Sequence, residues 1–164
     1  MPRVRNRRGY MKILFVCTGN TCRSVMAELI LKKMAEEKGI EGIEVSSAGT
    51  AAFPYYKIHG ELEKVMKKKG LDTSSHSATQ INNALIGDSD IILVMEQKHK
   101  DYICAMQPRA GTKVFLLREY AGEKDGKGIP DPIGMPEKVY SAAFKEIEKY
   151  LEKSFSIMMK KRKA

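Results

Sequence analysis

The sequence predicts a single α/β domain built on a four-stranded, mostly parallel sheet with helices on both faces. Short apolar runs rich in β-branched residues recur along the chain, at 13–17, 43–47, 91–95 and 113–117. Segments in which apolar residues have helical spacing separate these runs, and this alternation is typical of βαβ units with right-handed crossovers. A length of 164 residues suits one domain with a proper core.

Each strand is expected to lead into a helix. The first strand is followed at once by a helix from Ser24 to a stop at Gly39, because apolar side chains recur there every three or four positions. The same spacing, together with glycine and proline stops, predicts four more helices, which end at Gly70, span about 79–86, span 97–107, and open at Pro136.

The net charge of +9 comes from the two ends of the chain. Eight of the 29 basic residues lie within 3–8 and 160–163, which leaves 21 basic residues against 20 acidic ones. Frayed basic termini are common, so we expect no specific nucleic-acid binding. We divide the chain into a disordered basic extension at 1–10, one domain at 11–158 and a basic tail at 159–164.

The cysteines and the apolar runs exclude several protein classes. Three cysteines at uneven spacing form no disulfide framework, and no Cys/His pair has zinc-finger spacing, so we expect neither a metal nor another cofactor. The apolar run at 13–17 is far shorter than a membrane span or a signal-peptide core. The chain is therefore expected to be cytoplasmic and to make no membrane contact.

The loop at 17–24 carries the strongest sign of chemistry. It joins a buried strand to a helix amino terminus, where unpaired backbone N–H groups and the helix dipole favour an anion. It lacks both the Gly-Lys-Ser/Thr ending of a nucleotide-binding loop and the Gly-x-Gly-x-x-Gly of a dinucleotide site. Instead Cys17 opens the loop and Arg23 follows six positions later.

This spacing suits the binding of a phosphoryl group. The amides of the intervening residues can curl into a nest, while Arg23 closes the ring and binds two phosphate oxygens. Cys17 then lies beneath the phosphorus, in a positive field that favours its thiolate. We expect Ser24 to cap the helix and to donate a hydrogen bond to that thiolate. The predicted substrate-binding residues are Thr18, Gly19, Asn20, Thr21, Cys22 and Ser24. Among these, Gly19 and Asn20 tolerate the positive φ of a tight curl.

The motif resembles the low-molecular-weight protein tyrosine phosphatase family, whose loop has the form Cys-x-Gly-Asn-x-Cys-Arg-Ser. The similarity covers roughly residues 11–155 and includes 47–50, 71–78, 90–95 and the pair Asp131-Pro132. One departure is Val25, where the family usually has proline, and we expect it to have little effect.

The resemblance implies a mechanism and a set of supporting residues. Cys17 would attack phosphorus, and Asp131 would protonate the leaving group and then deprotonate the water that hydrolyses a cysteinyl-phosphate. Phosphorylated proteins would be the substrates. The resemblance also implies that Ser47 and His76 join Asn20 and Ser24 in a hydrogen-bonded network that holds the loop.

Thr21 and the residues after Asp131 bear on the substrate. Tyrosine-specific members of the family usually have an aliphatic residue in place of Thr21 and an aromatic residue soon after the Asp-Pro pair. Ile133 and Gly134 follow that pair here, and the whole loop is similar to that of the bacterial protein-arginine phosphatases. We therefore expect phosphoarginine as the substrate. The alternative is a tyrosine phosphatase in which Tyr55 or Tyr56 supplies the aromatic wall.

Two further classes are less consistent with the sequence. An arsenate reductase of this type needs two more cysteines as a redox relay, and beyond the loop only Cys104 is present. A noncatalytic phosphoprotein-binding module would not need Asp131. Within the loop, Cys22 is placed to capture an oxidised Cys17 as a disulfide, which predicts reversible redox regulation.

Overall fold

Four parallel strands form the centre of the structure, a computed structural model that describes residues 10–163. The strands are β1 (Met11–Cys17), β2 (Ile43–Gly49), β3 (Ile91–Val94) and β4 (Val114–Leu116), in the order β2-β1-β3-β4. Every adjacent pair is parallel. The predicted fold class is confirmed.

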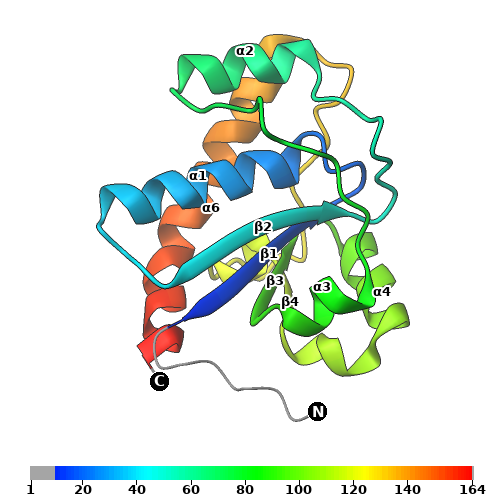
Figure 1. Ribbon diagram of the computed structural model, residues 1–164, viewed down its shortest axis with the longest axis vertical. Helices are drawn as coiled ribbons and strands as arrows, with labels where there is room; N and C mark the ends of the chain where they lie inside the picture. The colour runs from blue at the N-terminus through cyan, green and yellow to red at the C-terminus, as the bar shows by residue number, and fades with distance from the viewer. Residues whose placement is uncertain (1–9, 164) are drawn as a thin grey trace.

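Helices cover both faces of the sheet. In Figure 1, α1, α2 and α6 lie on one side, and α3 and α4 lie on the other. The helices are α1 (Arg23–Glu37), α2 (Gly60–Lys68), α3 (Asn83–Asp88), α4 (Gln97–Met106), α5 (Leu117–Tyr120) and α6 (Glu137–Lys163), with a 3₁₀ turn, η1, at Pro108–Thr112.

The central strand shows why its sequence is apolar at almost every position. Side chains of a strand alternate between faces, so Ile13 and Phe15 of β1 pack toward α1 and α6, while Leu14 and Val16 pack toward α3 and α4. All four are essentially inaccessible to solvent. A strand buried on both faces reads as a continuous apolar run, which explains the run at 13–17.

Several boundaries differ from those predicted. The first helix ends at Glu37, just before Gly39, which has a φ of 63°. The third begins at Asn83 because residues 79–82 instead run beside the end of β2, where the amide of Ile81 donates to the carbonyl of Gly49. The strand at 113–117 is shorter than predicted, since Leu117 begins α5.

The carboxyl end of the chain also differs from the expectation. Residues 159–163, expected to form a basic tail, continue α6. Met158 is buried and Met159 packs against the core, and Arg162 donates to the carbonyl of Glu41, so the last turns have tertiary contacts. The extension expected at 1–10 lies outside the described residues except for Tyr10, whose hydroxyl donates to Glu44 at 2.6 Å. Among the described residues, no helix is both long and apolar enough to span a bilayer.

Candidate active site

The loop between β1 and α1 opens into a cleft at the carboxyl edge of the sheet. The cleft has a volume of about 390 Å³. It is lined by Cys17, Thr18, Gly19, Thr21, Cys22, Arg23, Ala51, Tyr56, Lys57, Asp131 and Ile133. The predicted nucleophile, the predicted phosphate-binding arginine and the predicted acid thus share one cleft, although they come from two loops far apart in sequence.

Ser24 is directed at the sulfur of Cys17. Its Oγ lies 2.9 Å from Sγ and also accepts a hydrogen bond from Nδ2 of Asn20 at 2.8 Å. Because Oγ accepts from the amide, its own proton is available to the sulfur, which stabilises a thiolate. The predicted helix cap differs, since Cys22 occupies the N-cap position and makes no side-chain cap.

Asn20 is the centre of the network that supports the loop. Its backbone has a φ of 55°, the left-handed conformation predicted there, whereas Gly19 does not adopt a positive φ. Its Nδ2 also donates to Oγ of Ser47 at 2.9 Å, and its Oδ1 accepts from the amide of Thr79 at 2.9 Å. Nε2 of His76 lies 2.7 Å from its carbonyl oxygen and therefore donates to it. The structure thus brings Ser47 and His76 to the loop.

Asn20 and Ser24 differ from the other four predicted substrate-binding residues. Both are completely buried and neither lines the cleft. Thr18, Gly19, Thr21 and Cys22 do line it. The side chains of Asn20 and Ser24 therefore support the loop from within the protein.

Gly49 allows the end of β2 to approach the loop closely. A Cβ at this position would lie 2.3 Å from the carbonyl oxygen of Thr18 and 2.9 Å from the amide of Asn20. The residues that follow bind the loop, since the amides of Thr50 and Ala51 donate to the carbonyls of Cys17 and Thr18. Any side chain at residue 49 would displace the loop.

Arg23 is buried beneath the cleft and held by three groups. Its Nη1 donates to Oε2 of Glu96 at 2.6 Å and to the carbonyl of Ile129 at 2.7 Å, while Nη2 lies 3.5 Å from Oδ2 of Asp131. Partial burial acts to raise the pKa of Glu96, but the hydrogen bond and the charge of Arg23 hold that pKa below its usual value. The guanidinium is thus fixed in the site before any anion binds.

Asp131 reaches the cleft from the loop after α5. Its side chain is 40% exposed, and Oδ1 accepts a hydrogen bond from the amide of Ile133 at 3.1 Å. This loop is bound to the sheet by the amide of Ile129, which donates to the carbonyl of Met95 at 2.7 Å. The second loop therefore meets the first at the carboxyl edge of the sheet.

The side chains of two residues, Glu96 and His99, contact the loop residues and were not predicted from the sequence. Glu96 directly follows the strand run at 91–95, and its place at the carboxyl edge is a signal that could have identified it. His99 lies in α4 with Nε2 2.9 Å from Oγ1 of Thr18. No sequence pattern distinguishes this histidine from an ordinary helix residue.

The walls of the cleft contain one of the two tyrosines considered as an aromatic wall. Tyr56 lines the cleft, whereas Tyr55 is 72% exposed and stacks on Phe53 at 5.4 Å between ring centroids. Ile133 also lines the cleft and is 58% exposed. Cys104 is half-buried and does not line the cleft.

The described residues offer no cluster for a metal ion. No group of three or more His, Cys, Asp or Glu side chains within 10–163 is placed to hold one. All three cysteines, Cys17, Cys22 and Cys104, are free thiols in the structure.

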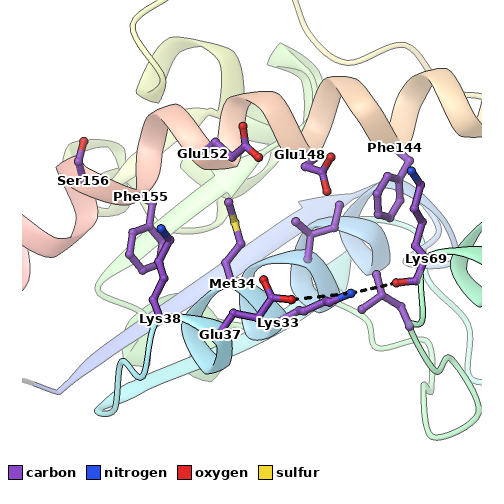
Figure 2. Close-up of a pocket in the computed structure, with 12 residues that line it drawn as sticks. Lys33, Met34, Glu37, Lys38, Lys69, Phe144, Glu148, Glu152, Phe155 and Ser156 are labelled. Atoms are coloured by element: carbon purple, nitrogen blue, oxygen red, sulfur yellow. Dashed lines mark hydrogen bonds and ion pairs between the residues drawn. The ribbon is translucent and has the colours of Figure 1, made fainter.

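A second groove, of about 700 Å³, lies between α1 and α6. Figure 2 shows Lys33 of α1 and Lys38, which directly follows α1, on one side and Phe144 and Phe155 of α6 on the other. Lys33 donates to the carbonyl of Lys69 at 3.1 Å. None of the predicted site residues lines this groove.

Comparison with known proteins agrees with this geometry. Residues 12–164 match the model of the family described as low molecular weight phosphotyrosine protein phosphatase. The chain is 39% identical over 142 residues to the protein-arginine-phosphatase of Geobacillus stearothermophilus, covering 87% of this chain and 92% of that one. It is 38% identical over 144 residues to the low molecular weight protein-tyrosine-phosphatase PtpB of Staphylococcus epidermidis, covering 87% and 96%. The solved structure of the YwlE arginine phosphatase from Geobacillus stearothermophilus superposes with a TM-score of 0.82 at 36% identity, over 93% of this chain and 95% of that one.

Proposed function

The chain belongs to the low molecular weight phosphotyrosine protein phosphatase family and is a protein phosphatase, and from this premise we propose that it hydrolyses phosphoarginine on proteins. The proposal has two parts. The first assigns the steps of the reaction to side chains in the cleft. The second assigns the substrate, and it depends on the residues that form the cleft wall.

The first step transfers the phosphoryl group to Cys17. The thiolate attacks phosphorus and the bond from phosphorus to the leaving nitrogen breaks, while Asp131 gives its proton to that nitrogen. Free arginine side chain departs and a cysteinyl-phosphate remains. Arg23 and the loop amides neutralise charge on the equatorial oxygens, and they are fixed in place before the reaction, which lowers its reorganisation cost.

The second step returns the thiolate. Asp131, now ionised, takes a proton from water, and the water oxygen attacks phosphorus as the bond to sulfur breaks. Inorganic phosphate leaves. The Ser24 hydroxyl, 2.9 Å from Sγ, stabilises the departing thiolate by donating a hydrogen bond to the sulfur.

The observation that supports phosphoarginine is the polar character of the wall at Thr21. Thr21 lines the cleft, and its Oγ1 would lie 3.4 Å from a Cβ placed on Gly19, another lining residue, so the hydroxyl is close to Gly19 in the loop. A hydroxyl can bond to the N–H groups of a phosphoguanidine, which a phenyl ring does not offer. The leaving nitrogen is also strongly basic and departs poorly without the proton that Asp131 supplies. The names of the protein-arginine-phosphatase relatives support the same substrate.

Phosphotyrosine is the second candidate, and Tyr56 favours it. Tyr56 lines the cleft and the residue is 40% exposed, so a flat phenyl group would find an aromatic surface there. Several relatives are named protein-tyrosine-phosphatases. The same catalytic groups would act on both candidate substrates. The substrates differ only in the leaving group that contacts the cleft wall.

Release of inorganic phosphate from two matched peptides tests the proposal. The peptides have one sequence and carry either phosphoarginine or phosphotyrosine, and kcat/KM is measured for each. We expect the phosphoarginine peptide to be preferred by at least tenfold, the ratio that one hydrogen bond in a desolvated site can produce. Cys17→Ser serves as the control for contaminating phosphatase. Preference for phosphotyrosine would reject the substrate assignment.

A further inference from the structure

His99 connects α4 to the phosphate loop through two hydrogen bonds. It is completely buried. Its Nδ1 accepts from the backbone amide of Glu96 at 3.1 Å, and its Nε2 lies 2.9 Å from Oγ1 of Thr18. Glu96 also binds Arg23, so one short segment of the chain contacts both ends of the loop.

These contacts define where the imidazole proton lies. A backbone amide can only donate, so Nδ1 carries no proton and the single proton of the neutral ring is on Nε2. Burial, assisted by the positive charge of Arg23, lowers the pKa of His99 to about 4. The ring is therefore neutral at physiological pH, and Nε2–H donates to the Thr18 hydroxyl.

The Thr18 hydroxyl then keeps its own proton for another partner. A hydroxyl has one proton and two lone pairs, and the bond from His99 uses only a lone pair. Within residues 10–163, Oγ1 of Thr18 makes no other hydrogen bond, and Thr18 lines the cleft directly after Cys17. The hydroxyl thus belongs to the residue that follows the proposed nucleophile, in the same cleft.

We propose that the Thr18 hydroxyl donates a hydrogen bond to an oxygen of the phosphoryl group, and that His99 is the positioning residue that orients it. The inference rests on the phosphoryl transfer proposed above, and not on the choice of arginine over tyrosine. A free threonine side chain samples three rotamers. The bond from a rigid, buried ring selects one before the substrate binds, so no reorganisation is needed as charge develops on the phosphoryl oxygens.

A double-mutant cycle separates this role from simple packing. Thr18→Val removes the hydroxyl at nearly constant shape, and His99→Leu removes the donor. The readout is kcat/KM for phosphate release, with melting temperatures recorded for every variant. We expect each single change to lower kcat/KM by about tenfold, the effect of one lost hydrogen bond in a desolvated site. In the Thr18→Val background, His99→Leu should lower it by less than about twofold, because the hydroxyl to be oriented is gone.

Conservative variants complete the design. Thr18→Ser keeps the hydroxyl, and His99→Gln keeps an N–H donor near the place of Nε2, so both should retain activity within about threefold of wild type. If His99→Leu does not fold, His99→Met, which also lacks an N–H donor, takes its place in the cycle. The proposal is overturned if Thr18→Val equals wild type, or if the His99 loss is the same in both backgrounds.

The choice of substrates keeps this result apart from the proposed function. Phosphoryl oxygens are common to phosphoarginine and phosphotyrosine peptides, so the losses should be equal on both. If the wild-type protein prefers phosphotyrosine, the substrate assignment is rejected, but the result expected from the double-mutant cycle stays the same. Losses confined to one substrate would overturn the inference, because they would place Thr18 against the leaving group.

Discussion

Nη1 of Arg23 and Oε2 of Glu96 lie 2.6 Å apart, so the guanidinium of the phosphate loop is paired with a carboxylate before any anion arrives. Arg23 is buried, whereas the Glu96 side chain is one-third exposed. A buried cation without a partner would be costly, and a flexible one would bind phosphate poorly. The pair therefore orients the guanidinium while it reduces the net positive charge that the phosphoryl group meets.

The two effects of Glu96 are separable by substitution. Glu96→Gln keeps a hydrogen-bond acceptor and removes the charge, so we expect a kcat close to that of wild type and tighter inhibition by inorganic phosphate. Glu96→Ala removes both, and a loss of orientation should lower kcat/KM by about tenfold. Steady-state kinetics and the inhibition constant of phosphate measure both effects. An unchanged kcat/KM in Glu96→Ala would show that Ile129 and the loop orient Arg23 without it.

Asp131→Asn tests the acid at almost constant structure. The amide oxygen still accepts from the amide of Ile133, so the loop keeps its conformation. We expect a loss of more than about a hundredfold on phosphoarginine, whose nitrogen needs a proton, and a loss below about tenfold on an activated aryl phosphate. The measurement is kcat on both substrates. Equal losses would remove Asp131 from the acid role.

The sequence predicts the sheet and the loop well because both depend on short-range patterns. Apolar runs define the strands, and the spacing of Cys17 and Arg23 defines the loop without reference to the rest of the chain. Short elements are harder to predict. The turn at η1 and the four residues of α5 contain less than two helical turns, so no periodicity can reveal them. The last turns of α6 depend on contacts with Glu41 and the core.

The supporting residues of the site lie beyond local patterns for a similar reason. His99 contacts Thr18 across 81 positions, and Glu96 contacts Arg23 across 73. Neither contact can be predicted from the spacing of residues in the sequence. Both depend on the pairing of β3 with β1, which brings the carboxyl ends of the two strands to one edge of the sheet. Ser47 and His76 were expected only through resemblance to a family, and their contacts with Asn20 span 27 and 56 positions.

His99 should make the stability of the protein depend on pH. In the unfolded chain it takes up a proton near its usual pKa of about 6.5, whereas in the fold it does so only near pH 4. Between these values the unfolded state binds more protons, so the free energy of unfolding falls as the pH falls from about 6.5 to about 4. Urea unfolding of wild type and His99→Gln at pH 7 and pH 5 measures this. The variant should have a lower free energy of unfolding than wild type, and the difference between the two should be smaller at pH 5 than at pH 7. A difference independent of pH would contradict the buried neutral ring.

Cys22 should protect Cys17 from irreversible oxidation. Burial, together with the adjacent charge of Cys17, raises the pKa of the Cys22 thiol, so it stays protonated and does not compete as the nucleophile. When peroxide converts Cys17 to its sulfenic acid, we expect the Cys22 thiol to displace the hydroxyl, which leaves as water with the thiol proton, and a disulfide to form.

The test compares recovery after peroxide treatment. Activity should return with dithiothreitol in wild type and in Cys104→Ala, whose cysteine does not line the cleft, but much less in Cys22→Ala. Intact-mass measurement of the oxidised wild type should show the loss of two hydrogens. Equal recovery in all three proteins would remove Cys22 from the resolving role.

Thr21→Ile tests the substrate assignment at the residue of the cleft wall on which the assignment depends. The change removes the hydroxyl and adds apolar surface, while Cys17, Arg23 and the network around Asn20 are untouched. Activity should move from phosphoarginine toward phosphotyrosine, because an isoleucine contacts a phenyl ring well and offers nothing to a guanidine N–H. One lost hydrogen bond to the substrate is worth roughly 1–3 kcal/mol, so the ratio of the two kcat/KM values should change by at least tenfold. Thr21→Ser keeps the hydroxyl and is the matched control, with a ratio near that of wild type. If the ratio is unmoved in Thr21→Ile, the wall at Thr21 does not select the substrate, and Tyr56 becomes the residue to substitute.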